Sequence, residues 1–69
     1  MSEEMDFFIY LLESYADHKG RLSRDVLGEW DGRGVTDDIM AGYWGYHTEA
    51  IENAFEDIDS LLETGRHAW

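Results

Sequence analysis

Carboxylates recur at helical spacing in the last third of the sequence, and they are the residues best placed to do chemistry. The five members of this acidic row are Glu49, Glu52, Glu56, Asp59 and Glu63. Intervals of three or four residues put them within one arc of an α-helix, so each has a neighbour of like charge. Four such pairs cost about 0.2–0.5 kcal/mol each, whereas the core of so short a chain contributes about 3–5 kcal/mol. The row is either a solvated face that keeps the protein soluble or an anionic stripe that docks a basic partner.

The histidines are the other candidates for proton chemistry. His18 and His67 lie near the ends of expected helices, where the helix dipole stabilises a cation. His47 stands between Tyr46 and the start of the last expected helix. It either satisfies backbone groups where two helices meet or acts as an acid–base group together with Glu49.

Catalytic and metal sites are not expected from the remaining polar residues. Ser23 and Ser60 have no evident histidine partner, and 69 residues leave little room for a cleft that excludes water. The chain has no cysteine and no His-Glu-x-x-His, glycine-rich phosphate loop or calcium loop. A straight row of carboxylates cannot surround an ion. We therefore expect a protein that is not an enzyme and that has no catalytic residue, metal or cofactor.

The composition narrows the class of partner. Sixteen acidic residues against five basic ones give a formal net charge of −11, which opposes nucleic-acid binding because that binding depends on neutralising phosphates. Residues 23–46 have a helix–turn–helix layout, but the second helix would open with Asp37 and Asp38 and has no Lys or Arg. An acidic mimic of nucleic acid is a further alternative. The acidic N-terminus is unlike a signal peptide, and the apolar run Phe7–Leu12 is too short to span a membrane. We expect a cytoplasmic protein that binds neither nucleic acid nor membranes.

Helical periodicity runs through the chain, and no segment alternates as a strand does. The expected helices span residues 3–18, 23 to about 30, 36 to about 46, and 48–64. Ser23 and Thr36 are the predicted N-caps, and Gly20 and Gly65 the predicted C-terminal stops. A chain of this mass exposes about 4,400 Å² when folded and holds one small core. The prediction is an all-α, compact bundle of three to four short helices, with a single domain at residues 3–64 and a frayed tail at residues 65–69.

The first expected helix has a wider apolar surface than one packing partner requires. Its main face consists of Met5, Phe8, Ile9, Leu12, Tyr15 and Ala16. Phe7 and Leu11 lie outside this face and widen the apolar arc to about 200°, whereas packing on one side needs little over 100°. Either neighbouring helices wrap this helix on two sides, or Phe7 and Leu11, with Tyr10, form a patch for a partner or a second copy.

A series of short motifs also runs through the chain in a specific order. The motifs are Phe7-Phe8-Ile9-Tyr10, Leu12-Glu13, Asp25-Val26-Leu27, Trp30, Gly34-Val35, Ile39, Tyr43, His47 and Glu56-Asp57-Ile58. Over about residues 5–62, this series resembles a family of short, acidic, uncharacterised bacterial domains, the domain of unknown function 3791 series. Members of that family are often encoded beside an ADP-ribosyltransferase-like toxin, so the resemblance implies a toxin–antitoxin or regulatory partner. The resemblance implies no catalytic residue, and His47 is the one polar position that it raises.

Glycines mark the departures from that family pattern. Gly42 and Gly45 stand where larger helix formers are usual, and the segment from residue 31 to residue 34 is richer in glycine. A glycine inside a helix costs about 1 kcal/mol relative to alanine. Gly42 and Gly45 therefore either permit close packing of helices or break the third helix early.

These patterns together predict a small acidic protein–protein interaction module, antitoxin-like or regulatory, that docks a basic protein partner through the acidic row. On the family resemblance, that partner is a toxin from a neighbouring gene. Phe7 and Leu11 would add an apolar anchor or a homodimer contact. The alternative is a self-associating structural helical protein without enzymatic activity.

Overall fold

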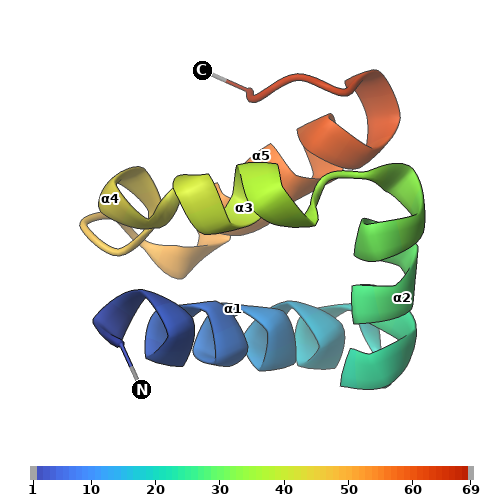
Figure 1. Ribbon diagram of the computed structural model, residues 1–69, viewed down its shortest axis with the longest axis horizontal. Coiled ribbons are helices and arrows are strands. Elements are labelled where there is room, and N and C mark those ends of the chain that lie inside the picture. Colours follow the sequence, from blue (N-terminus) through green and yellow to red (C-terminus); the bar gives the residue numbers. More distant parts are fainter. Residues whose placement is uncertain (1, 69) are drawn as a thin grey trace.

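The computed structural model describes residues 2–68, and within them the chain forms five helices joined by short turns (Figure 1). They are α1 (Glu3–Lys19), α2 (Ser23–Arg33), α3 (Thr36–Ala41), α4 (Tyr43–Tyr46) and α5 (Ile51–Thr64). α2 leads away from the end of α1, α3 and α4 run back over α1, and α5 lies behind them (Figure 1). The prediction of a small all-α bundle is confirmed, with three longer helices and two short ones. No helix within residues 2–68 is long and apolar enough to cross a membrane.

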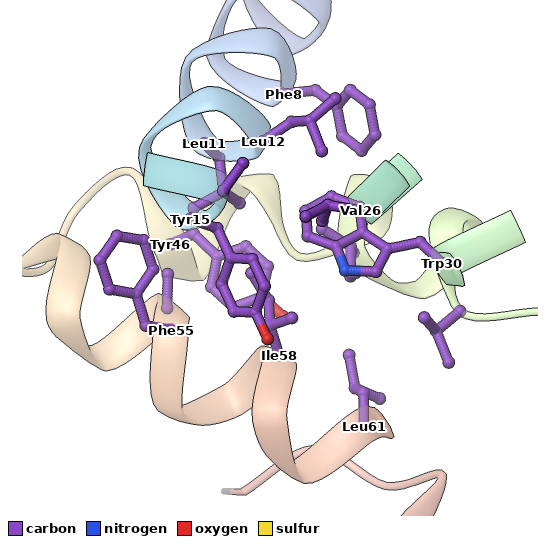
Figure 2. Packing of buried hydrophobic residues seen from close by; sticks show 14 residues of the cluster. Phe8, Leu11, Leu12, Tyr15, Val26, Trp30, Tyr46, Phe55, Ile58 and Leu61 are labelled. Carbon is purple, nitrogen blue, oxygen red and sulfur yellow. The ribbon is translucent and has the colours of Figure 1, made fainter. Parts of the chain in front are cut away.

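The core is built around Trp30 of α2, which is fully buried. Phe8 and Tyr15 of α1 meet the indole edge-on, with ring centroids 5.9 and 5.6 Å away, and Phe55 of α5 packs against Tyr15 at 5.8 Å (Figure 2). Edge-to-face pairs of this kind stabilise a fold by about 0.5–1.5 kcal/mol beyond the burial of area. The folded chain exposes 4434 Å², as expected for a protein of this size with one small core.

Leu11 belongs to this core, which corrects the prediction that it contributes to a surface patch. Only 1% of Leu11 is exposed, and Figure 2 shows its side chain among the other buried residues. The reason is that α1 contacts α2, α3 and α4, so neighbouring helices cover more than its main apolar face. Ile9, which was predicted on that main face, lies at the surface instead.

Three helices, α1, α2 and α5, end at glycines in the left-handed conformation, and Gly65 stops α5 as predicted, with φ of 75°. Gly20 stops α1 as predicted: its φ is 68°, and its N–H points back to the carbonyls of Ala16 and Asp17. α2 continues three residues beyond Trp30 and ends in the same way at Gly34, with φ of 73°. The second helix is therefore longer than the sequence predicts.

The predicted N-caps Ser23 and Thr36 are wrong. Each is the first residue inside its helix, with Leu22 and Val35 at the N-cap positions, and no side chain caps either helix. The Thr36 hydroxyl donates instead to Oδ1 of Asp31, at 2.5 Å. A carboxylate from the end of α2 thus takes the hydroxyl that the local pattern assigns to capping.

Gly42 divides the predicted third helix into α3 and α4. A Cβ atom at this position would lie less than 3.0 Å from ring atoms of Tyr46, so the backbone and the ring approach closely only because residue 42 is glycine. Of the alternatives drawn from the sequence, the early break of the third helix therefore holds at Gly42, and the close approach there is to a side chain four residues later rather than to another helix. α5 begins at Ile51, three residues later than predicted, and the Thr48 hydroxyl bonds to the last carbonyls of α4.

The segment after α5 is docked rather than frayed where the structure describes it. The chain turns at Gly65 and runs back over α5 (Figure 1). The Ser60 hydroxyl donates to the Arg66 carbonyl at 2.8 Å, and residues 67 and 68 reach Asp57 on α5. The prediction of a frayed tail is thus wrong for residues 65–68, because a buried carboxylate needs the donors that this segment supplies. Trp69, also part of the predicted tail, lies outside the described residues.

Candidate functional site

Five aromatic rings gather where the start of α1 meets α4, and we call this group the aromatic cluster. Its members are Phe7, Tyr10, Tyr43, Trp44 and His47. Phe7 contacts the Tyr43 ring edge-on at 5.6 Å, Trp44 meets Tyr43 edge-on at 5.3 Å, and His47 stacks on Tyr43 at 4.1 Å. α4 has only four residues and yet supplies two of the rings, and His47 follows it directly. The cluster therefore depends on how α4 is held over α1.

Much of the aromatic cluster faces solvent. Trp44 is 73% exposed and Tyr10 is 57% exposed, which makes them two of the large apolar side chains on the surface. Burying such a side chain is favourable, and Trp and Tyr are enriched among the residues that dominate protein–protein binding. The cluster thus presents rigid, amphipathic area that the fold itself does not use.

The charge around the cluster has a single sign. The rings of the cluster come from residues 3–10 and 43–49. These two segments include Glu3, Glu4, Asp6 and Glu49 and have no Lys or Arg. Desolvation, together with the negative charges of Glu3 and Glu4, raises the pKa of Tyr43 above its ordinary value. The segments that carry the aromatic cluster are therefore acidic, and Glu3 and Glu4 act on the Tyr43 hydroxyl.

The His47 side chain donates a hydrogen bond to a backbone carbonyl. Its Nδ1 lies 2.5 Å from the carbonyl oxygen of Tyr43, and because a carbonyl only accepts, Nδ1 is the donor. Glu49, its proposed acid–base partner, accepts a hydrogen bond from the amide of Asn53 at 3.2 Å. The geometry favours the interpretation in which His47 satisfies the backbone at a helix junction. Its ring adds to the aromatic cluster.

The acidic row is interrupted in the structure. Glu49 lies before α5 begins, whereas Glu52, Glu56 and Glu63 are exposed on the helix. Asp59 is half-buried and engaged by α1: Lys19 Nζ lies 2.9 Å from it, and the Tyr15 hydroxyl donates to it at 2.6 Å. Three carboxylates of the row therefore remain exposed on α5, fewer than the sequence predicts.

The environment of Asp59 alters two pKa values. Partial burial raises the pKa of Asp59, but the hydrogen bonds from Tyr15 and Lys19 and the charge of Lys19 outweigh it, so the pKa lies below its usual value. Burial, followed by the hydrogen bond to Asp59, raises the pKa of Tyr15 well above its ordinary value. The Lys19–Asp59–Tyr15 contact therefore joins α1 to α5 as a structural link.

Asp57 is the polar residue that the sequence analysis missed. It is fully buried, and its carboxylate accepts from the Tyr46 hydroxyl, from Nδ1 of His67 at 2.6 Å and from the backbone N–H of Ala68. Burial, then the hydrogen bond and the charge of Asp57, raise the pKa of Tyr46 far above its ordinary value. The sequence signal is weak: Asp57 is buried together with Ala54, Phe55, Ile58 and Leu61, but at helical spacing it lies beside their apolar face rather than on it.

The comparisons with known proteins identify the family. The family model described as protein of unknown function (DUF3791) matches residues 6–65. The chain belongs to this family. Neither the curated proteins nor the solved structures gave a match.

The DUF3791 match includes every ring of the aromatic cluster and Asp57, and it ends before His67 and Ala68. No group of three or more His, Cys, Asp or Glu residues within residues 2–68 of this DUF3791 chain could hold a metal ion. The chemistry that the described residues offer is therefore an exposed aromatic surface on acidic segments, and separately a buried carboxylate that ties three segments together.

Proposed function

We propose that this DUF3791 chain is a small protein–protein interaction module that docks a basic partner through the aromatic cluster. The observation that carries the proposal is the exposure of Trp44 and Tyr10 on segments, residues 3–10 and 43–49, that have four acids and no Lys or Arg. Aromatic faces attract cations, and Arg in particular stacks on Trp while it pairs with carboxylates. The partner that fits is a protein surface presenting Arg or Lys beside aliphatic side chains.

The exposed carboxylates of α5 play a second part in this proposal. Glu52, Glu56 and Glu63 would steer a basic partner toward the module, because long-range attraction raises the association rate more than the final affinity. The aromatic cluster would then supply the short-range contact. Phe7 is part of that contact, whereas Leu11 is buried in the core and is not available to a partner.

In this role the protein is an antitoxin-like or regulatory module of a bacterial cytoplasm, without enzymatic activity of its own. The family resemblance suggests a basic toxin from a neighbouring gene as the partner. The same exposed rings would also suit a second copy, which is the alternative of a self-associating helical protein. Charge favours a different partner, because a second copy would bring Glu3, Glu4, Asp6 and Glu49 against the same four acids.

The test is quantitative capture by matched variants. Tagged wild-type protein, Trp44→Ala and Leu22→Ala are used to capture proteins from the native cell at low and high salt. Leu22 is the control, since it is 56% exposed and not part of the cluster. We expect basic proteins that are captured by the wild type and by Leu22→Ala, lost with Trp44→Ala and weakened by salt. Equal capture by all three variants would refute the proposal. A light-scattering mass of a dimer, lowered to a monomer by Trp44→Ala, would favour self-association instead.

A further inference from the structure

The C-terminal segment at residues 65–68, which we call the strap, meets α4 on a single buried carboxylate. Asp57 is fully enclosed, and its two oxygens receive three donors from different segments. Tyr46 reaches it from α4, and His67 and Ala68 reach it from the strap. A buried carboxylate is tolerated only while such donors are in place, so the loss of one weakens the hold on the others.

Tyr46 links the buried carboxylate of Asp57 to the exposed rings of α4. It is buried in α4, with Tyr43 and Trp44 in the same four-residue helix and His47 immediately after it. Its ring also packs against the backbone at Gly42, where α3 ends. A helix this short is not stable by itself, so its place depends on the side chain that anchors it.

We propose that the strap is a positioning device for the aromatic cluster: by completing the shell around Asp57, it holds Tyr46 and therefore α4 in the geometry that docks the partner. This inference rests on the proposed function. Asp57 and His67 are positioning residues, since neither belongs to the aromatic cluster itself. Release of the strap leaves Asp57 short of donors, loosens α4 and disperses the rings. The same protein can thus exist in a docking-competent state and a loosened one, with the occupancy of the strap setting the balance.

Hydrogen exchange in the free protein tests the positioning step without a partner. The amides of Tyr46 and His47 bond to the carbonyls of Gly42 and Tyr43, at 2.9 and 3.0 Å, and they report the integrity of α4. In His67→Ala and in Tyr46→Phe we expect their exchange to accelerate about ten- to hundredfold, the range for losing a hydrogen bond to a charged group. Exchange at the core amide of Ile58 corrects for any change in global stability.

Tyr15→Phe is the matched control. It also removes a buried tyrosine hydroxyl that donates to an aspartate of α5, in this case Asp59, but Tyr15 belongs to α1 and contacts neither the strap nor α4 through that bond. After correction by Ile58, the amides of α4 should exchange at the wild-type rate in Tyr15→Phe. Acceleration in Tyr46→Phe and His67→Ala alone supports the strap. Unchanged exchange in both, or equal acceleration in Tyr15→Phe, overturns it.

Partner capture then separates this inference from the proposed function. If Trp44→Ala and His67→Ala both weaken capture, the strap positions a docking surface, as proposed. If Trp44→Ala weakens capture and His67→Ala leaves it unchanged, the strap has no part in docking and the inference fails. If Trp44→Ala leaves capture unchanged, the proposed function fails, and the exchange rates alone decide whether the strap holds α4.

Discussion

Replacing Gly42 by alanine should destabilise the protein, although the backbone conformation alone predicts the opposite. The φ of Gly42, −78°, is open to any residue, and at such a position alanine in place of glycine stabilises a protein by about 0.4–1 kcal/mol because it restricts the unfolded chain. The added Cβ, however, would lie within 3.0 Å of three atoms of the Tyr46 ring. That ring is buried and its hydroxyl is bound to Asp57, so it cannot move aside cheaply.

The magnitude follows from these opposing terms. Overpacking a filled site costs about 1–3 kcal/mol, and a rigid, buried ring places Gly42→Ala in the upper half of that range. After the gain from the restricted unfolded chain, the net loss is about 1–2 kcal/mol of the roughly 3–5 kcal/mol that stabilises a chain of this size. Urea unfolding followed by circular dichroism at equilibrium would measure this loss.

Gly32→Ala in α2 provides the matched control, because a Cβ there meets nothing within 4 Å. It should stabilise the protein by about 0.5–1 kcal/mol. Gly42→Ala in a Tyr46→Leu background should cost much less than in the wild type, since the clash disappears with the ring. A Gly42→Ala protein as stable as the wild type, or more stable, would refute the close approach and with it the reason for the break between α3 and α4.

Four further predictions follow from the same contacts. The raised pKa values of Tyr15 and Tyr46 mean that the folded state keeps its phenolic protons at a pH where the unfolded chain loses them. The tyrosine contribution to stability is therefore complete below the ordinary tyrosine pKa of 10.0 and lost as the pH rises above it; urea midpoints should fall in that range, and less so in Tyr15→Phe and Tyr46→Phe. The lowered pKa of Asp59 has the opposite sign, so its contribution is present above the ordinary aspartate pKa of 3.8 and lost as the pH falls below it; Asp59→Asn should flatten that acid limb. Leu11→Ala should cost about 2–5 kcal/mol, whereas Leu22→Ala should stay within about 0.5 kcal/mol, and equal costs in thermal melts would contradict the placement of Leu11 in the core. Reversing Glu52 and Glu56 to Lys should leave the fold intact or slightly stabilised, because it lowers the large excess of negative charge on the chain, while slowing partner association at low salt; an unchanged association rate would exclude them from steering.

The sequence predicts the features of this fold that depend on local chemistry. The helices around Phe8, Trp30 and Ile58 follow from apolar periodicity, and Gly20 ends α1 because only a residue without a side chain adopts its backbone conformation readily. The N-caps Ser23 and Thr36 fail since capping competes with other partners: the Thr36 hydroxyl is taken by Asp31. Local pattern identifies a donor, but tertiary packing selects its acceptor.

The candidate site was predicted in part, for a similar reason. Phe7 and His47 stand out in the sequence, but the meeting of Phe7 with Tyr43 and His47 depends on α4 folding back over α1, which no spacing rule encodes. For Leu11 the sequence leaves two alternatives, a surface patch or cover by neighbouring helices, because a helical wheel cannot show that three helices contact α1; the second alternative holds. Asp57 was overlooked because its donors come from residues 46, 67 and 68, which helical periodicity does not connect to it.

The central claim is that the aromatic cluster docks a basic partner, and the most direct test is the affinity of a captured partner for Trp44→Ala relative to the wild type. Isothermal titration with the purified partner at fixed salt would measure it. Trp44 is largely exposed, so its loss should leave the fold unchanged. For a residue that dominates an interface we predict a loss of about 2 kcal/mol or more, which is roughly thirtyfold in Kd. A Kd within about twofold of the wild type, with the fold intact, would contradict the account.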